Sequence, residues 1–400
     1  MGRDYDVIVV GAGPGGSTAA RFCAQAGLKT LLIEKEKLPR YKPCGGCLSV
    51  KTVDLLGFDL SSVIENTIYE VKFSYCLEDP FLIQSNQPIA FLVMRNRLDH
   101  LLVNKALEKG AEILEGSRAT GVKETGDGVE VELANGERLR GEYLIGADGA
   151  NSVVARSLSL FPLKSKTDGI GLESEIRFQS VANISKEDLR RIHLDFGRIP
   201  SGYGWVFPKR EGLSIGIGGM FMEKGRVDLR QSYIDFLKGL NYTHDVEAER
   251  VIGHLLPSFY DDGQKVSEGR VLLVGDAGHL IDPLTGEGIY YAIRSGMLAA
   301  EAIVESKEQG PTPSDHYQRS LSHEIFDNLK WALQFARFVN RFTRLSYRTL
   351  KHYPELGYFY LRVLEGKETY QGFVARVKER VKDLLGGRLS EKIKRAMAKI

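Results

Sequence analysis

A glycine-rich turn near the start of the chain constrains the fold more than any other feature. Residues 7–10 are four consecutive β-branched residues, and they lead into Gly11-Ala12-Gly13-Pro14-Gly15-Gly16. A run that is apolar on both faces is typical of a buried parallel strand. In such a strand–turn–helix unit, Gly11 permits the tight turn, Gly13 lets the backbone approach a phosphate, and Gly16 lets the helix pack close to the strand. The turn therefore predicts a Rossmann-like dinucleotide site.

The residues after the turn extend this expectation. Residues 17–26 are expected to form a helix that directs its N-terminal amides at the diphosphate, and Gly27 is expected to end it. The next apolar strand spans residues 30–33, and Glu34 follows it about 20 residues beyond the turn, where an acid binds ribose hydroxyls. A glycine-rich loop that binds nothing is the alternative, and the presence of strand, helix and acid together disfavours it.

A second segment, far along the chain, suits the other end of an extended cofactor. Residues 271–274 are apolar and run into Gly275-Asp276-Ala277, and residues 283–288 form a second glycine-rich turn. A flavin dinucleotide in an extended conformation needs contacts that are distant in sequence from its diphosphate site. The two segments together predict FAD.

Composition and charge fit an ordinary enzyme. The chain has 400 residues, enough for two or more domains. No apolar run approaches the roughly 18 residues of a membrane span, no leader precedes the first strand, and the cysteines are too few for a disulfide scaffold. We therefore expect a cytoplasmic protein. The net charge of +2 hides a basic end, because residues 331–400 contain 16 Lys and Arg against 6 Asp and Glu, a net charge of +10.

The basic C-terminal region mixes its charges with many aromatic side chains. We expect it to form a helical cap on the main body with a solvated positive face. Peripheral contact with anionic lipid on the inner membrane face is a second hypothesis, because basic amphipathic segments bind such surfaces. Nucleic acid is disfavoured as a partner because no nucleic-acid motif accompanies the charge.

Strand-like and helix-like patterns alternate along the chain in an interleaved order. They predict an α/β fold with α+β character, in which a Rossmann-like FAD-binding domain is interleaved with an antiparallel-sheet substrate domain and followed by a C-terminal helical region. We assign residues 1–60, 93–165 and 266–310 to the first, 61–92 and 166–265 to the second, and 311–400 to the third. Within the first domain we expect helices over 98–109 and 289–305 and a hairpin that turns at 134–136.

Several motifs, as a set, resemble the flavoprotein class of p-hydroxybenzoate hydroxylase. They are the first glycine turn with Glu34, Arg95-x-x-Leu98-Asp99, Gly146-Ala147-Asp148-Gly149 with Ser152, and Gly275-Asp276-Ala277. Within that class, Tyr41-Lys42-Pro43-Cys44-Gly45-Gly46 and residues 202–209 and 282–291 are similar to signatures of the geranylgeranyl reductase family, the archaeal digeranylgeranylglycerophospholipid reductases above all. Glu287 stands where that family usually has a third glycine.

The resemblance implies a set of FAD contacts. Arg95 suits the diphosphate as a charge-assisted donor. Asp276 lies beside the ribityl chain or caps a helix. Gly286 and Gly288 let backbone amides approach the flavin ring, and the positive end of a helix from Ile289 favours the anionic reduced flavin. The full set is Gly11, Gly13, Gly15, Gly16, Glu34, Cys44, Gly45, Cys47, Arg95, Ala119, Asp276, Gly286, Gly288 and Ile289.

The resemblance also implies a reaction, the saturation of isolated C=C bonds in geranylgeranyl chains of archaeal-type membrane lipid precursors by hydride from reduced flavin. Tyr203, Trp205 and Phe207 alternate, so a strand points all three to one side, as an apolar wall for the chain or as an ordinary core strand. We expect an external electron donor, and the lack of a second dinucleotide fingerprint leaves NAD(P)H, F420 and ferredoxin open as its identity. An FAD-dependent monooxygenase and a non-enzymatic prenyl-binding protein are the alternatives.

Cys44 is the candidate catalytic residue. The resemblance places it in a loop over the flavin, where it assists protonation or gating. Cys44-Gly45-Gly46-Cys47 also has CxxC spacing, but further zinc ligands are lacking, so we expect no metal and treat a disulfide as the minor alternative. Ser152 is expected to cap a helix, and a structural role is expected for His279 rather than proton donation.

Overall fold

The computed structural model describes residues 4–160, 168–220, 227–242, 250–261, 263–310 and 312–385. The chain forms two compact units, each assembled from three separated stretches. Unit 1 comprises Met1–Lys42, Arg95–Ser165 and Pro257–Asp327, and unit 2 comprises Pro43–Met94, Lys166–Leu256 and Asn328–Ile400. Residues 386–400, the last part of the expected basic region, lie outside the described residues.

The boundaries of the two units differ from the expected ones at residues 43–60, 93–94, 257–265 and 311–400. Residues 43–60 belong to unit 2 and not to the unit of the glycine turn, because β3 (Cys47–Ser49) pairs with β7 (Ala90–Val93). Residues 257–265 and 311–327 lie in unit 1, and the remaining C-terminal helices lie in unit 2. For residues 43–60 the boundary is decided by backbone pairing between strands distant in sequence, which local patterns do not reveal.

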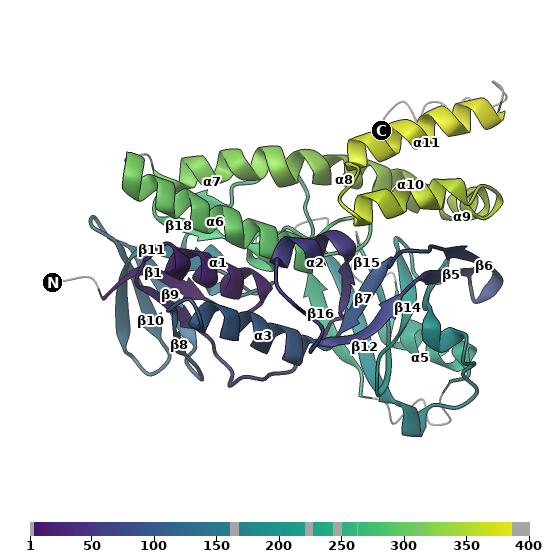
Figure 1. Cartoon of the computed structure of the whole chain (residues 1–400), viewed down its shortest axis with the longest axis horizontal. Helices are drawn as coiled ribbons and strands as arrows, with labels where there is room; N and C mark the ends of the chain where they lie inside the picture. Colours follow the sequence, from purple (N-terminus) through teal and green to yellow (C-terminus); the bar gives the residue numbers. More distant parts are fainter. Residues whose placement is uncertain are drawn as a thin grey trace. The chain divides into compact units, whose positions relative to one another are not determined.

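Unit 1 is built on an eight-stranded sheet with the order β17-β18-β11-β1-β2-β8, and β10 and β9 continue from β11 (Figure 1). β1 pairs in parallel with both β2 and β11, and its residues Val7 to Val9 are fully buried, as expected for an apolar run. The strands are β1 (Tyr5–Val10), β2 (Thr30–Ile33), β8 (Glu112–Leu114), β9 (Ala119–Glu124), β10 (Val129–Leu133), β11 (Arg138–Gly146), β17 (Ser267–Glu268) and β18 (Val271–Leu273).

Two helices of unit 1 begin three residues earlier than the sequence indicated, whereas the helix expected from Ile289 begins there. α1 spans Pro14–Gln25, because Gly13 serves as its N-cap and proline suits a first helical position. α3 begins at Arg95, so this arginine lies in the first turn of the helix. The helices are α1 (Pro14–Gln25), α3 (Arg95–Leu107), α4 (Val153–Ser157), α6 (Ile289–Gln309) and α7 (Pro313–Leu321).

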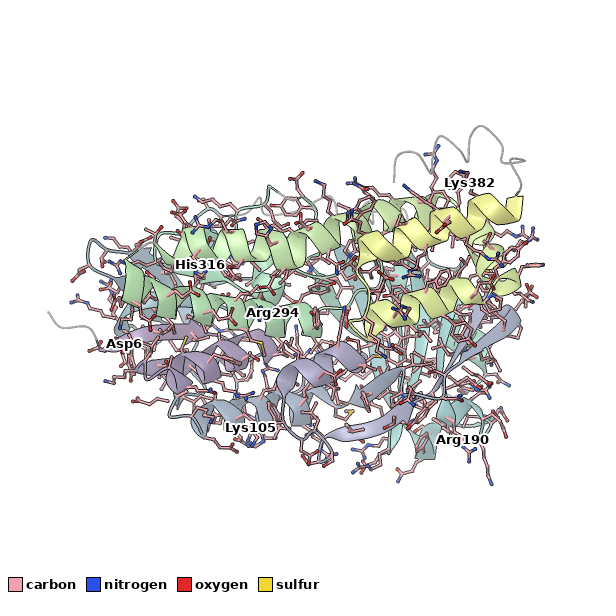
Figure 2. All side chains as sticks on the ribbon, turned by 45° about the horizontal axis from the view of Figure 1, so that its top comes forward. Asp6, Lys105, Arg190, Arg294, His316 and Lys382 are labelled. Atoms are coloured by element: carbon pink, nitrogen blue, oxygen red, sulfur yellow. The ribbon has the colours of Figure 1, made fainter. Side chains whose placement is uncertain are left out.

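Helix α6 packs against α1 and runs beside α7 (Figure 1). Its approach to α1 is close, because a Cβ at Gly296 would lie 2.4 Å from the carbonyl oxygen of Gly15. Arg294 of α6, which is labelled in Figure 2, pairs with Glu324 at 2.6 Å. Through the contact of Gly296 with Gly15, the glycine turn packs against a helix that lies far along the chain.

Unit 2 contains a seven-stranded sheet in the order β16-β12-β15-β14-β13-β5-β6 and a three-stranded sheet in the order β3-β7-β4. The strands not yet given are β4 (Ile64–Ile68), β5 (Glu70–Tyr75), β6 (Glu78–Gln84), β12 (Gly169–Arg177), β13 (Ile192–Phe196), β14 (Gly202–Pro208), β15 (Gly212–Gly219) and β16 (Ile252–Leu256). The helices are α2 (Val50–Leu56), α5 (Leu229–Leu240), α8 (Asp327–Arg341), α9 (Thr343–His352), α10 (Glu355–Leu364) and α11 (Tyr370–Leu385).

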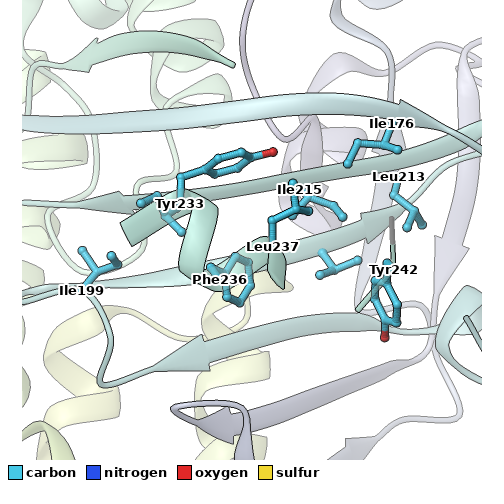
Figure 3. Close-up of a cluster of buried hydrophobic side chains, with 10 residues drawn as sticks. Ile176, Ile199, Leu213, Ile215, Tyr233, Phe236, Leu237 and Tyr242 are labelled. Carbon is cyan, nitrogen blue, oxygen red and sulfur yellow. The ribbon is translucent and has the colours of Figure 1, made fainter. Parts of the chain in front are cut away.

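One face of the larger sheet carries the main core of unit 2 (Figure 3). There Leu213, Ile215 and Ile217 of β15 join Tyr233, Phe236 and Leu237 of α5 in a cluster of buried side chains. The alternate residues of β15 are Ser214, Gly216 and Gly218, which leave the opposite face of this strand almost without side chains. Space on that second face is therefore available to side chains from neighbouring strands.

Candidate active site

The glycine turn of unit 1 divides into packed and open positions. Gly11 has φ +104°, and a Cβ there would lie 2.3 Å from the carbonyl oxygen of Ala147. A Cβ at Gly16 would lie 1.9 Å from the carbonyl oxygen of Gly11, so these two glycines let helix and strands approach. Gly15 lets α6 approach closely, since a Cβ there would lie 2.9 Å from the carbonyl oxygen of Ala292. At Gly13, in contrast, a Cβ would meet nothing within 4 Å, so this backbone borders open space.

Glu34, at the end of β2, is held beside this turn. Its side chain is buried and accepts the N–H of Ala12 at 3.0 Å and the N–H of Glu36 at 3.1 Å. Arg40 Nε lies 3.4 Å from the same carboxylate. The carboxylate is therefore fixed at the edge of the open space by backbone donors and a guanidinium.

Two arginines converge on Asp99, a residue that the sequence reading mentioned only as part of a motif. Arg95 donates to Asp99 from Nε at 2.8 Å and from Nη2 at 2.9 Å, and Arg40 Nη1 donates at 3.0 Å. Asp99 is fully buried. Arg40 thus links Glu34 to Asp99, and the buried acid orients the arginine that was expected to meet the diphosphate.

The second glycine-rich segment lies at the start of α6. Asp276 belongs to a short helix, η3 (Gly275–Gly278), and is not the N-cap of α6, which is Gly288. A Cβ at Gly288 would lie 3.6 Å from Asp276 Oδ1, and Lys42 Nζ lies 4.0 Å from Asp276 Oδ2. The carboxylate therefore stands next to the N-terminus of α6, which begins at the buried Ile289.

A buried aspartate shapes the turn before that helix. Asp282 is fully buried and accepts the N–H groups of Leu284 at 2.7 Å and Thr285 at 3.2 Å. Gly286 donates its N–H to the carbonyl oxygen of Asp282 at 2.9 Å and has φ +76°, which favours glycine. Ala119, the remaining expected contact of unit 1, is a buried residue at the first position of β9.

Two residues near these motifs, Ser152 and Asp148, hold the start of α4. Ser152 is the N-cap of α4, and its Oγ accepts the N–H of Ala155 at 2.9 Å, which confirms the expected cap. Asp148 accepts the N–H of Val153 at 2.6 Å, and burial raises the pKa of its carboxyl although these hydrogen bonds oppose the shift. His279 adopts a left-handed conformation with φ +53° and contacts Tyr260 edge to face, with ring centroids 6.0 Å apart.

In unit 2 the cysteine loop lies on the aromatic strand. A Cβ at Gly45 would lie 2.7 Å from the Phe207 ring and 3.3 Å from Trp205 Nε1, so only glycine allows this approach. The Gly46 N–H points at Cys44 Sγ, 3.4 Å away. All four cysteines, Cys23, Cys44, Cys47 and Cys76, are free, so the structure contains no disulfide between Cys44 and Cys47. Among the described residues no cluster of His, Cys, Asp and Glu has the arrangement of a metal site.

Tyr203, Trp205 and Phe207 share one face of β14, as the sequence indicated. Their ring centroids follow one another at 6.2 and 6.2 Å. The indole of Trp205 lies across the small residues of β15 and β12, since Cβ atoms at Gly216, Gly218 and Gly171 would lie 2.1, 3.5 and 3.9 Å from it. The glycines of β15 therefore form the floor on which the tryptophan rests.

Sequence reasoning missed three charged residues beside this loop. Glu173 Oε1 accepts the N–H of Cys44 at 2.6 Å, and Glu175 Oε1 lies 2.6 Å from Lys209 Nζ. Glu173 and Lys209 are buried, and burial raises the pKa of Glu175 while Lys209 opposes the shift. The available signal was the pair of acids at alternate positions of a strand, Glu173 and Glu175, which places both on one face.

Comparison with known proteins identifies the family. A family model for an FAD binding domain matches residues 4–187. The digeranylgeranylglycerophospholipid reductase of Thermoplasma acidophilum is 33% identical over 80% of this chain and 84% of its own. The chain belongs to the geranylgeranyl reductase family. It is therefore an FAD-dependent oxidoreductase, which confirms the fold class and the cofactor expected from the sequence.

Other members of this family lie at comparable similarity. The chloroplastic geranylgeranyl diphosphate reductase of Nicotiana tabacum is 30% identical over 82% of this chain and 72% of its own, and the menaquinone reductase of Mycobacterium tuberculosis is 31% identical over 84% and 85%. Among solved structures, a geranylgeranyl bacteriochlorophyll reductase-like protein of Thermoplasma acidophilum superposes with a TM-score of 0.79, 26% identity and 99% coverage of both chains.

Proposed function

We propose that this protein saturates isolated C=C bonds of geranylgeranyl chains carried by archaeal-type membrane lipid precursors. The observation that carries the proposal is the aromatic wall with the cysteine loop seated on it, in a member of a family whose relatives are named for prenyl substrates. The relatives are named for a phospholipid, a diphosphate and a quinone at 30–33% identity. The choice of the phospholipid head group is therefore the part of the proposal that most needs an experiment.

The residues of unit 1 fit FAD. The open space at Gly13 suits a diphosphate at the N-terminus of α1, and Glu34 is fixed where it can accept from ribose hydroxyls. We assign Arg95 to the diphosphate, and Asp276, Gly286 and Gly288 to the flavin end near the start of α6. Reduced FAD supplies the hydride for the alkene.

The wall proposed for the substrate is longer than the sequence indicated. On the face of Trp205, ring centroids lead from Tyr203 to Phe196 at 5.9 Å, from Phe196 to Phe73 at 6.3 Å and from Phe73 to Phe81 at 5.1 Å. The register places only uncharged residues on this face of β14, β13 and β5, whereas the other face of β5 and β13 carries Lys72, His193 and Asp195. Part of this face is covered within unit 2, since Phe73, Trp205 and Phe207 belong to a cluster with Ile68, Leu92 and Leu364. An uncharged, flexible hydrocarbon is the ligand that the rest of the face suits.

The chain's own contribution is to bind, orient and exclude water. An unactivated alkene has no carbonyl to polarise, so much of the reduction of the barrier comes from positioning and from a dry site. We propose that the Cys44 thiol faces the reacting bond and assists protonation. Its loop is fixed on the wall through Gly45, and the thiol is half-buried, which leaves it reachable.

The test is anaerobic reoxidation of the reduced enzyme. The purified protein is reduced with dithionite and then mixed with digeranylgeranylglycerophospholipid, geranylgeranyl diphosphate or menaquinone in parallel. Recovery of oxidised-flavin absorbance together with a gain of two hydrogens per double bond in the phospholipid supports the proposal. If only the diphosphate or only the quinone reoxidises the flavin, that compound replaces the phospholipid as the proposed substrate. Oxygen consumption with NAD(P)H but no response to any prenyl compound favours a monooxygenase.

We further propose that the protein works in the cytoplasm on the membrane surface, receives electrons from an external donor (NAD(P)H, F420 or ferredoxin), and contacts anionic lipid through its basic C-terminal helices. None of the described helices is long and apolar enough to span a bilayer. The exposed side chains of α8 and α9 include Arg337, Arg341, Arg344 and Arg348. Co-sedimentation with anionic but not with neutral liposomes at low salt supports this contact. Recovery of the protein in the supernatant with both kinds of liposome contradicts it.

A further inference from the structure

The cysteine loop is anchored at its two ends by different means. At its C-terminal end the anchors are backbone groups: Val93 donates its N–H to the carbonyl oxygen of Gly46 at 2.8 Å, and Cys47 pairs with Leu92. Gly46 has φ +70°, and a Cβ there would lie 2.1 Å from the carbonyl oxygen of Val93. At its N-terminal end the Cys44 N–H donates to a side chain, the buried carboxylate of Glu173, at 2.6 Å.

The carboxylate belongs to a small buried charge cluster, Glu173, Glu175 and Lys209. Glu173 and Glu175 lie at alternate positions of β12 and share a face with Trp205 and Phe207 through the register of β15. Lys209 pairs with Glu175 at 2.6 Å, and its Nζ would lie 3.4 Å from a Cβ at Gly46. The cluster therefore lies directly beneath the cysteine loop.

Stability does not account for this cluster. Taking charges out of water costs several kcal/mol per ion, and replacing a buried ion pair by apolar residues is often neutral or stabilising. Two acids on the same face of one strand also repel each other, and Glu173 contributes to the raised pKa of Glu175. The surrounding wall is otherwise aromatic, so apolar residues in place of Glu173 or of the Lys209–Glu175 pair as a whole would suit it. A local geometric requirement explains the charges better than the fold does.

We propose that Glu173, supported by the Lys209–Glu175 pair, is a positioning residue that fixes the Cys44 peptide and thereby the direction of the Cys44 thiol over the aromatic wall. The effect that this residue has on turnover rests on the proposed function. Its effect on the orientation and accessibility of the Cys44 thiol does not depend on the substrate. Glu173 acts through Cys44 and contacts no reacting atom in this assignment.

The test compares three variants of the FAD-loaded protein by alkylation with iodoacetamide, followed residue by residue by peptide mass spectrometry. Glu173→Leu removes the acceptor, Glu173→Gln keeps an oxygen acceptor, and Glu211→Gln changes an exposed acid in the turn that follows Lys209. Cys76, in the turn between β5 and β6, is the internal reference. We expect Glu173→Leu to change the alkylation rate of Cys44 about tenfold, as for loss of one hydrogen bond to a charged group, with Cys76 unchanged. Glu173→Gln keeps an uncharged acceptor and should change the Cys44 rate less than Glu173→Leu does, and Glu211→Gln keeps the wild-type rates.

A merely structural role predicts another pattern. If Glu173 only stabilised the unit, Glu173→Leu would change Cys44 and Cys76 alike, and that result, or an unchanged Cys44 rate, overturns the inference. In the reductase assay we expect Glu173→Leu to lower kcat about tenfold with KM retained and Glu173→Gln to restore it. Should Glu173→Leu not fold, Glu173→Asp withdraws the acceptor by one methylene and tests the same contact. A wild-type protein that reduces no prenyl compound refutes the proposed function, while the alkylation pattern still decides the inference.

Discussion

Gly13 and Gly16 belong to the same turn, yet the structure gives alanine substitutions at these positions opposite consequences. In Gly13→Ala the new methyl group enters space where nothing lies within 4 Å. Alanine is a poorer N-cap than glycine but restricts the unfolded chain more, and the two effects are both about 0.5–1 kcal/mol and opposite in sign. The unfolding free energy of the apoprotein therefore stays within about 1 kcal/mol of wild type. The space that the methyl group fills is the space we assign to the diphosphate.

Gly16→Ala places its methyl group 1.9 Å from the carbonyl oxygen of Gly11, which is backbone and cannot rotate away. Overpacking of this kind costs at least ~1–3 kcal/mol. Urea denaturation of both apoproteins measures the stabilities, and quenching of flavin fluorescence measures FAD affinity. We expect Gly13→Ala to bind FAD at least ~10-fold more weakly, a loss of about 1.4 kcal/mol, at near-normal stability. Wild-type affinity in Gly13→Ala would refute the placement of the diphosphate at this turn.

Three other perturbations test separate parts of the structure. Asp99→Asn removes the buried acid that holds Arg95 and Arg40, and we expect a loss of ~3–5 kcal/mol in urea denaturation together with weaker FAD binding. Its control, Glu108→Gln, breaks the exposed pair with Lys105 and costs less than ~1 kcal/mol. Burial lowers the pKa of His193 to about 4 from its ordinary value of 6.5, so the folded protein binds fewer protons than the unfolded chain between these values. Stability is therefore lost as the pH falls from 6.5 towards 4, by up to ~3 kcal/mol, and His193→Gln, measured by urea denaturation at pH 7 and 4.5, should lose correspondingly less. Trp205→Ala should raise KM for the prenyl substrate ~10-fold or more with unchanged flavin absorbance, whereas Trp331→Ala on α8 leaves KM unaltered; equal effects of the two variants contradict the proposed wall.

The features that the sequence predicted well are those that depend on local sequence patterns. The buried strand β1, the glycine turn, the acid after β2 and the cap at Ser152 each depend on a few neighbouring residues. The alternating aromatics of β14 were placed on one face for the same reason, because a strand has a period of two. The observed starts of α1 and α3 come three residues before the predicted ones, because Gly13 caps the first helix and the residues before Leu98 extend the first turn of the second.

What the sequence did not reveal depends on partners that are distant along the chain. Glu173 and Cys44 are separated by 129 positions, and Arg40 and Asp99 by 59, so no window of residues contains both partners. The assignment of residues 43–60 failed for the same reason, since β3 pairs with a strand that follows much later. The extension of the aromatic wall to Phe196 and Phe73 likewise required the register of β13 and β5.

The position of β11 at the centre of its sheet affects how the chain is made. β11 pairs with β1 and, through residues 138–141, with β10, both of which precede it. The remaining part of its outer edge, residues 144–146, has no strand to bond until residues 271–273 have been synthesised. At about 5–20 residues per second, the interval from Gly146 to Val271 lasts roughly 6–25 s on the ribosome. During this time the short apolar edge at residues 144–146 is open to other nascent chains. The glycine turn is translated first, but the helix that packs against it emerges only after this interval, so cofactor loading belongs to the last third of translation or to the period after release.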